Sequence, residues 1–192
     1  MERKVASCIP RQARFNTSQW DPLKMSPTPN GPWLKAPADF CCPFSTGEMV
    51  LVVLDAYSKY PEVEIVSSTA TGNTFPALER IFPAHGIPEG LKTDDGSLLQ
   101  GQAFHEFAME KSFHHGKITP LWPEANGHAE NFMKNLGKVG RTTRSQGKDW
   151  RTELYVFVAN YRATPHPSTG EKPLQVIHEL NSKGQAPHPP TS

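Results

Sequence analysis

Asp39, Asp94 and Glu130 are three carboxylates that could act together in metal chemistry if the fold brought them close to one another. Fifty-four residues separate Asp39 from Asp94, and 35 separate Asp94 from Glu130. Carboxylate oxygens are hard ligands of the kind that Mg²⁺ prefers. Two Mg²⁺ ions held about 3.5–4 Å apart can activate an attacking oxygen and stabilise a leaving oxygen during phosphodiester cleavage. Residues of this type could therefore hold such ions, and whether these three do so depends on the fold and on the motifs around them.

The element that must carry Glu130 is a helix. Residues 118–130 begin with a short β-type segment, turn through two prolines and become helix-forming near Glu124. Proline is tolerated just ahead of a first helical turn and disfavoured inside a helix. We therefore expect a helix over residues 124–145, with Glu130 about two turns from its start.

Hydrophobic patterning predicts the other elements. The continuous apolar run at 49–54 is typical of a strand buried on both faces, and helical spacing is clear at 71–84. Asp39 is expected near the end of the first strand, and Asp94 directly after the fourth. The order indicates an α/β fold with a mixed five-stranded sheet flanked by helices. Strands are expected at 34–41, 49–54, 62–66, 90–93 and 117–119, and further helices at 102–112 and 150–161.

Several motifs accompany the carboxylates in a fixed order. The chain reads LVVLDAYSKYPE at 51–62, HGIP at 85–88, NYRATPH at 160–166 and STG at 168–170. Together with the acidic residues and the turn before Glu130, these motifs resemble the catalytic core of retroviral and gypsy-type long-terminal-repeat retrotransposon integrases. The resemblance covers roughly residues 32–177.

The resemblance implies an RNase H-like fold and a polynucleotidyl transferase or nuclease that acts on DNA. Asp39 would bridge two Mg²⁺ or Mn²⁺ ions, Asp94 would complete one metal site and Glu130 the other. The implied reactions are trimming of a DNA 3′ end and attack of that end on target DNA. The implied partners are therefore element ends and target DNA, with a homodimer as the possible assembly.

A basic helical face follows Glu130. Lys134, Lys138 and Arg141 stand 4, 8 and 11 residues after it, which places them on the same face of a helix. An ordinary solvated helix mixes charges of both signs, so we expect these three residues to bind DNA phosphates. Asn126 and His128 lie within about a turn of the glutamate and are further candidates for DNA contact.

Three other titratable residues are expected outside the site. Asp55 follows a buried strand and precedes Tyr57 and Ser58, so we expect it to accept structural hydrogen bonds. No other residues nearby in the sequence would complete a metal site with His114 and His115, so we expect these two histidines to face solvent or to lie in the core.

Composition bounds the remaining possibilities. The chain has 192 residues and a formal net charge of +1, so DNA binding must come from a local basic patch. No signal peptide and no apolar run near 18 residues is present, so we expect a nuclear or cytoplasmic protein with no membrane segment. We expect an irregular leader at 1–31, a core domain at 32–180 and a disordered tail at 181–192. In the leader, Cys8 matches the first cysteine of the family's zinc module but Arg11 occupies the place of the second, so no zinc is expected.

Two classes of function remain at this point. The intact carboxylates favour an integrase core, a Mg²⁺-dependent strand transferase or endonuclease, possibly of reduced activity. The alternative is a non-catalytic DNA- or protein-binding module on the same fold. That alternative is favoured by the degraded zinc module and by Gly137 and Gly140, which each cost a helix about 1 kcal/mol relative to alanine. The sequence also departs from the family pattern at Asp95, where asparagine is usual, and at Cys42, where glycine is usual.

Overall fold

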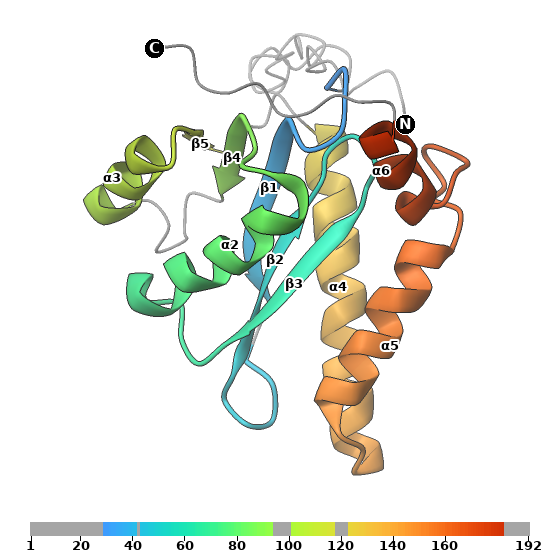
Figure 1. The fold of residues 1–192 in the computed structure, drawn as a ribbon. Coiled ribbons are helices and arrows are strands. Elements are labelled where there is room, and N and C mark those ends of the chain that lie inside the picture. The colour runs from blue at the N-terminus through green and yellow to red at the C-terminus, as the bar shows by residue number, and fades with distance from the viewer. Residues whose placement is uncertain (1–28, 42, 94–100, 118–122, 183–192) are drawn as a thin grey trace, which may run out of the picture.

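The computed structural model describes residues 29–41, 43–93, 101–117 and 123–182. Within these ranges a single β-sheet carries helices on both faces (Figure 1). No helix in them is both long and apolar enough to cross a membrane. The strands are β1 (Lys35–Cys41), β2 (Met49–Leu54), β3 (Pro61–Val66), β4 (Gly90–Thr93) and β5 (His114–Lys117), and the helices are α2 (Thr71–His85), α3 (Gln102–Glu110), α4 (Pro123–Gln146), α5 (Trp150–Ala163) and α6 (Pro173–Ser182).

The strands form a mixed sheet in the order β3-β2-β1-β4-β5. β2 pairs antiparallel with both β1 and β3, whereas β4 pairs parallel with both β1 and β5. Parallel neighbours need a crossover connection, and α3 supplies the one between β4 and β5. The predicted mixed five-stranded sheet flanked by helices is confirmed.

The position of the fifth strand is wrong in the sequence-based prediction. A strand is predicted at 117–119, whereas β5 spans His114–Lys117. The sequence His-His-Gly has no apolar alternation, so local patterning gives no signal. The strand is specified instead by its parallel pairing with β4, in which His115 lies opposite Leu91. Residues beyond Lys117 in the predicted range lie outside the described residues.

The predicted domain limits can be compared with the structure only where residues are described. Most of the core predicted at 32–180 is described, except for residues 42, 94–100 and 118–122, whereas the leader at 1–31 lies almost wholly outside the described residues. The tail predicted to start at residue 181 begins inside α6, which continues to Ser182.

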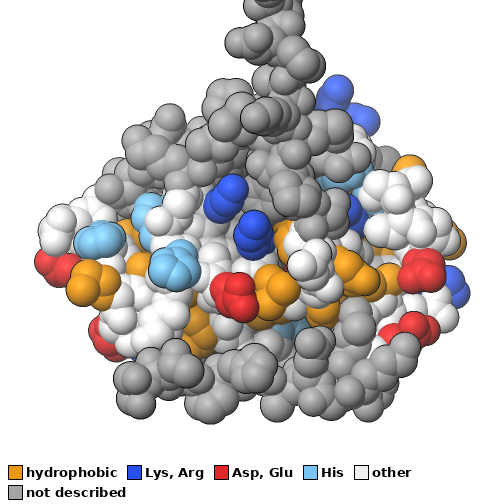
Figure 2. All heavy atoms as spheres, turned by 90° about the horizontal axis from the view of Figure 1, so that it is seen from above, with side chains coloured by type: hydrophobic (Ala, Val, Ile, Leu, Met, Phe, Trp, Pro, Cys, Tyr) orange, Lys and Arg blue, Asp and Glu red, His pale blue; other side chains and the backbone are white. Residues whose placement is uncertain are grey.

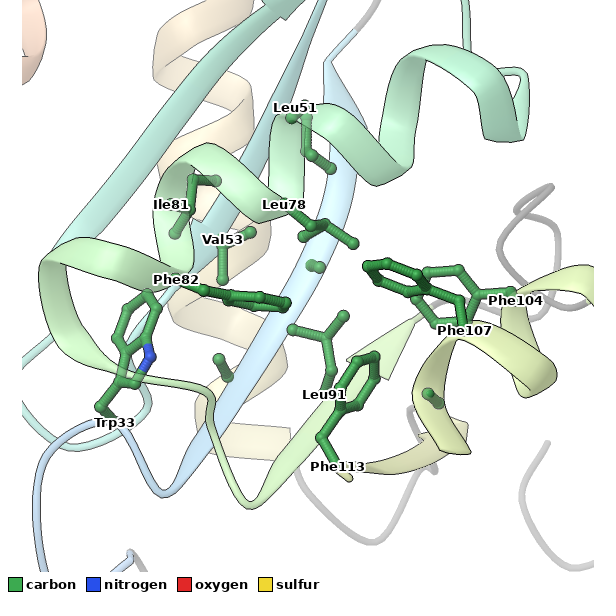
Figure 3. Packing of buried hydrophobic residues seen from close by; sticks show 14 of the residues in the cluster. Trp33, Leu51, Val53, Leu78, Ile81, Phe82, Leu91, Phe104, Phe107 and Phe113 are labelled. Atoms are coloured by element: carbon green, nitrogen blue, oxygen red, sulfur yellow. The ribbon is translucent and has the colours of Figure 1, made fainter. Parts of the chain in front are cut away.

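Two hydrophobic clusters, one on each face of the sheet, hold the elements together. Side chains alternate between the faces along a strand, so Leu51 and Val53 join the first cluster while Val50 and Val52 join the second. This explains why β2 is apolar throughout. The first cluster packs α2 and α3 on the sheet through residues such as Leu78, Ile81, Phe82, Phe104, Phe107 and Phe113 (Figure 3). The second packs α4 and α5 on the sheet through Phe132, Leu136, Trp150, Leu154 and Val158.

α4 is continuous across Gly137 and Gly140. A Cβ added at Gly140 would lie 2.9 Å from a ring carbon of Phe44. That ring is buried and stacks on Trp150, with 4.2 Å between the ring centroids. Glycine at this position therefore lets the loop after β1 pack directly against α4. This contact gives a structural reason for a glycine that the sequence marks only as costly to the helix.

Candidate active site

Asp39 lies in the central strand, on the sheet face that α4 covers. Ala36 and Ala38 point into the first hydrophobic cluster, so Asp39 and Cys41 point to the opposite face. Cys41 belongs to the second cluster, which confirms this alternation. The Asp39 side chain is partly exposed, and its Oδ1 accepts a hydrogen bond of 2.7 Å from the backbone N–H of Phe40. The carboxylate is thus fixed on the sheet and accessible to solvent.

α4 runs beside β1 in the same direction and brings Glu130 to the height of Asp39. Cys41 Sγ lies 3.9 Å from the backbone oxygen of Met133. Later in both segments, Gly140 of α4 contacts Phe44, which follows β1. The two contacts together show that α4 and β1 run in the same direction. Glu130 precedes Met133 by three residues, or about 4.5 Å along a helix. Asp39 precedes Cys41 by two residues, or about 6.6 Å along a strand. The two carboxylates therefore differ in height by only about 2 Å along the shared direction.

The third predicted carboxylate, Asp94, lies outside the described residues. Thr93, the last described residue of β4, pairs with the residue before Asp39. Thr93 is buried, and its Oγ1 lies 2.9 Å from Nε2 of His115. Burial, and then the charge of nearby His105, lowers the pKa of His115, so its ring is neutral at pH 7. The described residues thus anchor the end of β4 beside Asp39, and the convergence of all three carboxylates stays a prediction.

The predicted basic face lies on the flank of α4 that carries Glu130. Lys134, Lys138 and Arg141 are all exposed and fall within about 80° of Glu130 around the helix. On the opposite flank, Phe132 packs against α5 through an aromatic contact of 5.5 Å between ring centroids. The basic side chains therefore face away from α5 and remain accessible to a ligand beside the carboxylates.

The other two candidates for DNA contact are Asn126 and His128. The side chain of Asn126 lies outside the described part of the chain. The ring of His128 lies edge-on against that of His166, with 4.8 Å between centroids, and points away from Glu130 because two residues turn a helix by about 200°. Burial, followed by the charges of His128 and Lys59, lowers the pKa of His166 to about 4. A role of either candidate in DNA binding remains a prediction.

Asp55 has the structural role that the sequence predicts. Its side chain is fully buried. Oδ1 accepts hydrogen bonds from the backbone N–H groups of Trp33 (2.9 Å) and Tyr57 (3.2 Å). Oδ2 accepts from the backbone N–H of Ser58 (2.9 Å) and from its hydroxyl (2.5 Å). Asp55 lies beside the start of β1, because the next residue's N–H bonds to the carbonyl of Lys35, and is separate from Asp39.

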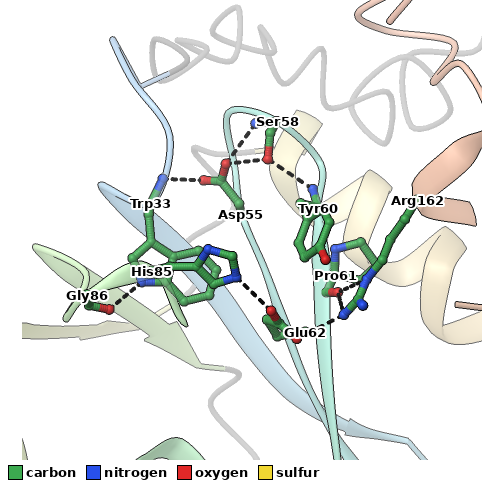
Figure 4. Close-up of polar contacts among 9 residues, drawn as sticks. All are labelled: Trp33, Asp55, Ser58, Tyr60, Pro61, Glu62, His85, Gly86 and Arg162. Atoms are coloured by element: carbon green, nitrogen blue, oxygen red, sulfur yellow. Dashed lines mark hydrogen bonds and ion pairs between the residues drawn. The ribbon is translucent and has the colours of Figure 1, made fainter. Parts of the chain in front are cut away.

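The motifs that carry the family resemblance meet at the start of β3 (Figure 4). Glu62 Oε2 lies 2.8 Å from Arg162 Nη2 on α5, and its Oε1 lies 2.6 Å from Nε2 of His85 at the end of α2. Arg162 also donates two hydrogen bonds to the carbonyl of Pro61 and lies over the ring of Tyr60. One carboxylate on an edge strand thereby ties together helices from opposite faces of the sheet.

A tryptophan extends this network. The indole N–H of Trp33 donates a 2.7 Å hydrogen bond to the carbonyl of Gly86, the residue that caps α2. The indole also packs on His85, with 4.6 Å between the ring centroids. These motifs therefore link β3 to α2 and α5 and stabilise the fold, and they are separate from the candidate site. The sequence marks the motifs but does not reveal that they contact one another.

The fold belongs to a known class, that of integrase catalytic cores, which have an RNase H-like fold. The chain is similar to one in the simian T-cell lymphotropic virus intasome, solved by cryo-electron microscopy in complex with PP2A regulatory subunit B56 gamma. The match has a TM-score of 0.66 and 16% identity and covers 88% of this chain and 66% of that one. The catalytic core domain of BIV integrase matches with a TM-score of 0.64 and 11% identity, over 79% of this chain and 99% of that one. The predicted RNase H-like fold is confirmed.

Sequence relatives identify the family. The chain is 31% identical over 176 residues to the uncharacterized protein K02A2.6 of Caenorhabditis elegans. It is 28% identical over 158 residues to the retrovirus-related Pol polyprotein from transposon gypsy of Drosophila melanogaster, and 26% identical over 132 residues to the Gag-Pol polyprotein of feline leukemia virus. These matches cover 91%, 71% and 67% of this chain but only 14%, 15% and 8% of those proteins. No protein-family model matches the chain. The chain is a homologue of retroviral and gypsy Pol polyproteins with the fold of their integrase core.

Proposed function

We propose that the protein is an integrase-type catalytic core that cleaves and joins DNA strands. The observation that carries this proposal is the placement of Asp39 and Glu130 at nearly the same height on adjacent elements, in a homologue of Pol polyproteins. The substrates would be the ends of a DNA element and the target DNA. Homology to integrase cores also implies dependence on a divalent metal in general.

The residues present fit a hard divalent cation. Asp39 and Glu130 supply carboxylate oxygens and are accessible to solvent, and Mg²⁺ keeps several waters, so that few protein ligands suffice. The described ranges contain no group of three or more potential metal-ligating side chains, and Asp94, the proposed third ligand, lies outside them. Two bound Mg²⁺ or Mn²⁺ ions would supply activation of the attacking oxygen and charge neutralisation at the phosphate.

The basic residues of α4 would bind and orient the DNA backbone. The ammonium groups of Lys134 and Lys138 and the guanidinium of Arg141 lie one to three turns beyond Glu130 on an exposed face. Phosphate contacts of this kind are independent of sequence and release counterions, so the affinity falls as salt rises. Because the chain carries a formal net charge of only +1, this local face would supply the attraction.

The experiment that tests the proposal is cleavage of branched DNA in Mg²⁺ or Mn²⁺. Wild-type protein should release product, and Glu130→Gln and Asp39→Asn should each lower the rate by about 100-fold or more, because a neutral amide is a weaker ligand for a hard cation. Glu171→Gln, at an exposed carboxylate in the loop after α5, is the matched control and should keep wild-type activity.

The other outcomes separate the alternatives. Wild-type protein that binds DNA without cleaving it would be the non-catalytic module. Wild-type protein that neither binds nor cleaves DNA would refute the proposal. Equal rates for Glu130→Gln and Glu171→Gln would show that the cleavage arises elsewhere.

We further propose that the protein acts in the nucleus as an oligomer, a homodimer being the simplest. The intasome that contains the similar viral chain supports an assembly of this kind. Sedimentation equilibrium at several protein concentrations measures the oligomeric state, and a monomer at all concentrations, with or without DNA, would contradict it.

A further inference from the structure

Lys35 and Lys92 share a face of the sheet with Asp39. Lys35, Pro37 and Asp39 are alternate residues of β1, and the alanines between them point into the first hydrophobic cluster on the other face. Lys92 on β4 pairs with Pro37, midway between the other two. Strand geometry places the Cα of Lys92 about 8 Å, and that of Lys35 about 13 Å, from the Cα of Asp39.

Solvent reaches this part of the sheet. The second cluster, which lies under α4 and α5, contains side chains from β1, β2 and β3 and none from the described residues of β4 or β5. Lys35 and His114 are exposed, and Lys92 is partly exposed. A Cβ at Gly116 would meet Lys92 Cγ at 3.9 Å, so the lysine stem lies over β5. Figure 2, seen from the end at which β1 begins, shows exposed basic side chains and histidines on this end.

The two lysines lie on the opposite side of the carboxylates from the basic face of α4. α4 runs parallel to β1, and Lys134 follows Glu130 along it. Lys35 and Lys92, in contrast, precede Asp39 along the same direction. Positive charge is therefore present both before and after the pair of carboxylates.

We propose that Lys35 and Lys92 bind the DNA backbone on this second side, so that a strand is held on both sides of the reacting phosphate. This inference rests on the proposed function. A strand fixed at one side only can swing about its contacts, whereas two fixed sides hold the reacting phosphate against the carboxylates and reduce the entropy lost in reaching the transition state. The ligand recognised is the phosphodiester backbone itself, so the contacts do not depend on base sequence.

The test is the salt dependence of binding to branched DNA. Each phosphate contact contributes about 0.9 to the slope of log affinity against log salt. Lys92→Gln and Lys35→Gln should therefore each lower the slope by about 0.9 and weaken binding about eightfold at about 0.1 M salt, and the double variant should lose about 60-fold. Lys92→Arg keeps the charge and should bind as wild type does. Lys172→Gln, at an exposed lysine between α5 and α6, is the control and should not change the slope.

The outcomes separate this inference from the function on which it rests. A wild-type slope in Lys92→Gln and Lys35→Gln, with a lower slope in Lys134→Ala, would overturn the inference and leave the proposed function intact. Wild-type protein without measurable DNA affinity would overturn both. Thermal unfolding without DNA distinguishes a structural role: a lower Tm in Lys92→Gln combined with an unchanged slope would mean that the lysine only offsets the charge of nearby carboxylates.

Discussion

Replacing Asp55 by asparagine tests whether Asp39 on β1 and Asp55, directly after β2, have separate roles. Asp55 is fully buried and accepts four hydrogen bonds, three of them from backbone N–H groups. Asparagine has nearly the same size, but only one of its two terminal atoms is an acceptor. If its oxygen takes the place of Oδ1, its NH₂ group points at the N–H and hydroxyl of Ser58.

The expected cost follows from the bonds that are lost. A buried donor left without a partner costs about 1–3 kcal/mol, and the Ser58 N–H is buried. The loss of the carboxylate also weakens the remaining bonds, because hydrogen bonds to a charged acceptor are roughly twice as strong as neutral ones. We expect Asp55→Asn to lower the free energy of unfolding by about 3 kcal/mol, and Asp55→Ala by about 4–5 kcal/mol because the Trp33 N–H also loses its acceptor.

Urea denaturation at pH 7 measures this effect, and Asp39→Asn is the matched control. Asp39 is partly exposed, and one bond that it accepts comes from the adjacent backbone N–H. Its replacement should change the free energy of unfolding by less than about 1 kcal/mol while removing DNA cleavage. Equal urea midpoints for wild type and Asp55→Asn would refute the structural role, and strong destabilisation by Asp39→Asn would show that the two roles are not separate.

Three further changes test the packing. Gly140→Ala should lower the free energy of unfolding by about 1–2 kcal/mol in urea denaturation, because its Cβ meets the buried ring of Phe44 at 2.9 Å. This cost outweighs the better helix propensity of alanine. Gly127→Ala is the control and should not destabilise the protein, because no atom lies within 4 Å of the new Cβ. Burial lowers the pKa of His166 to about 4, so the unfolded state, in which the pKa is near 6.5, binds a proton more readily. The free energy of unfolding should therefore be highest above about pH 6.5 and should fall as the pH drops towards 4. His166→Gln should flatten this dependence in urea midpoints measured across that range. Arg162→Met should cost about 2–3 kcal/mol because it removes the arginine partner of Glu62 and leaves that carboxylate with His85 alone. Arg162→Lys should not fully restore stability because lysine lacks the planar fork that bonds Pro61 and Glu62 together. A wild-type Tm in Arg162→Met would show that these contacts do not stabilise the fold.

Local patterns account for the elements that the sequence predicts correctly. The apolar run of β2 and the helical spacing of α2 and α5 are properties of neighbouring residues, and the Gly86 cap follows from the backbone freedom of glycine, which adopts φ 85° there. β5 is different because His114 and Gly116 carry no such pattern and their strand is specified by a neighbour 24 residues earlier in the sequence.

Some features of the candidate site can likewise be predicted from the sequence, whereas others depend on contacts between distant residues. Asp39 and Glu130 can be found from the sequence because carboxylates at this spacing, beside the family motifs, point to metal chemistry. Their similar position along β1 and α4 depends on the parallel direction of these two elements, which the contact between Gly140 and Phe44 fixes and no local pattern reveals. Lys35 lies on the same strand as Asp39, but Lys92, 57 positions after Lys35, comes near Asp39 only through the pairing of β1 with β4. The sequence offers no signal for that pairing.

If Asp39 and Glu130 hold the same metal centre, their contributions to Mn²⁺ affinity are coupled, and a double-mutant cycle measures that coupling. Isothermal titration of wild type, Asp39→Asn, Glu130→Gln and the double variant gives four binding free energies. Ligands of one centre are coupled, so we expect each single variant to weaken Mn²⁺ binding and the double variant to lose at least about 1 kcal/mol less than the sum of the single losses. Losses that add within about 0.3 kcal/mol, or a Glu130→Gln protein that binds Mn²⁺ as wild type does, would contradict the assignment of these two carboxylates to one active site.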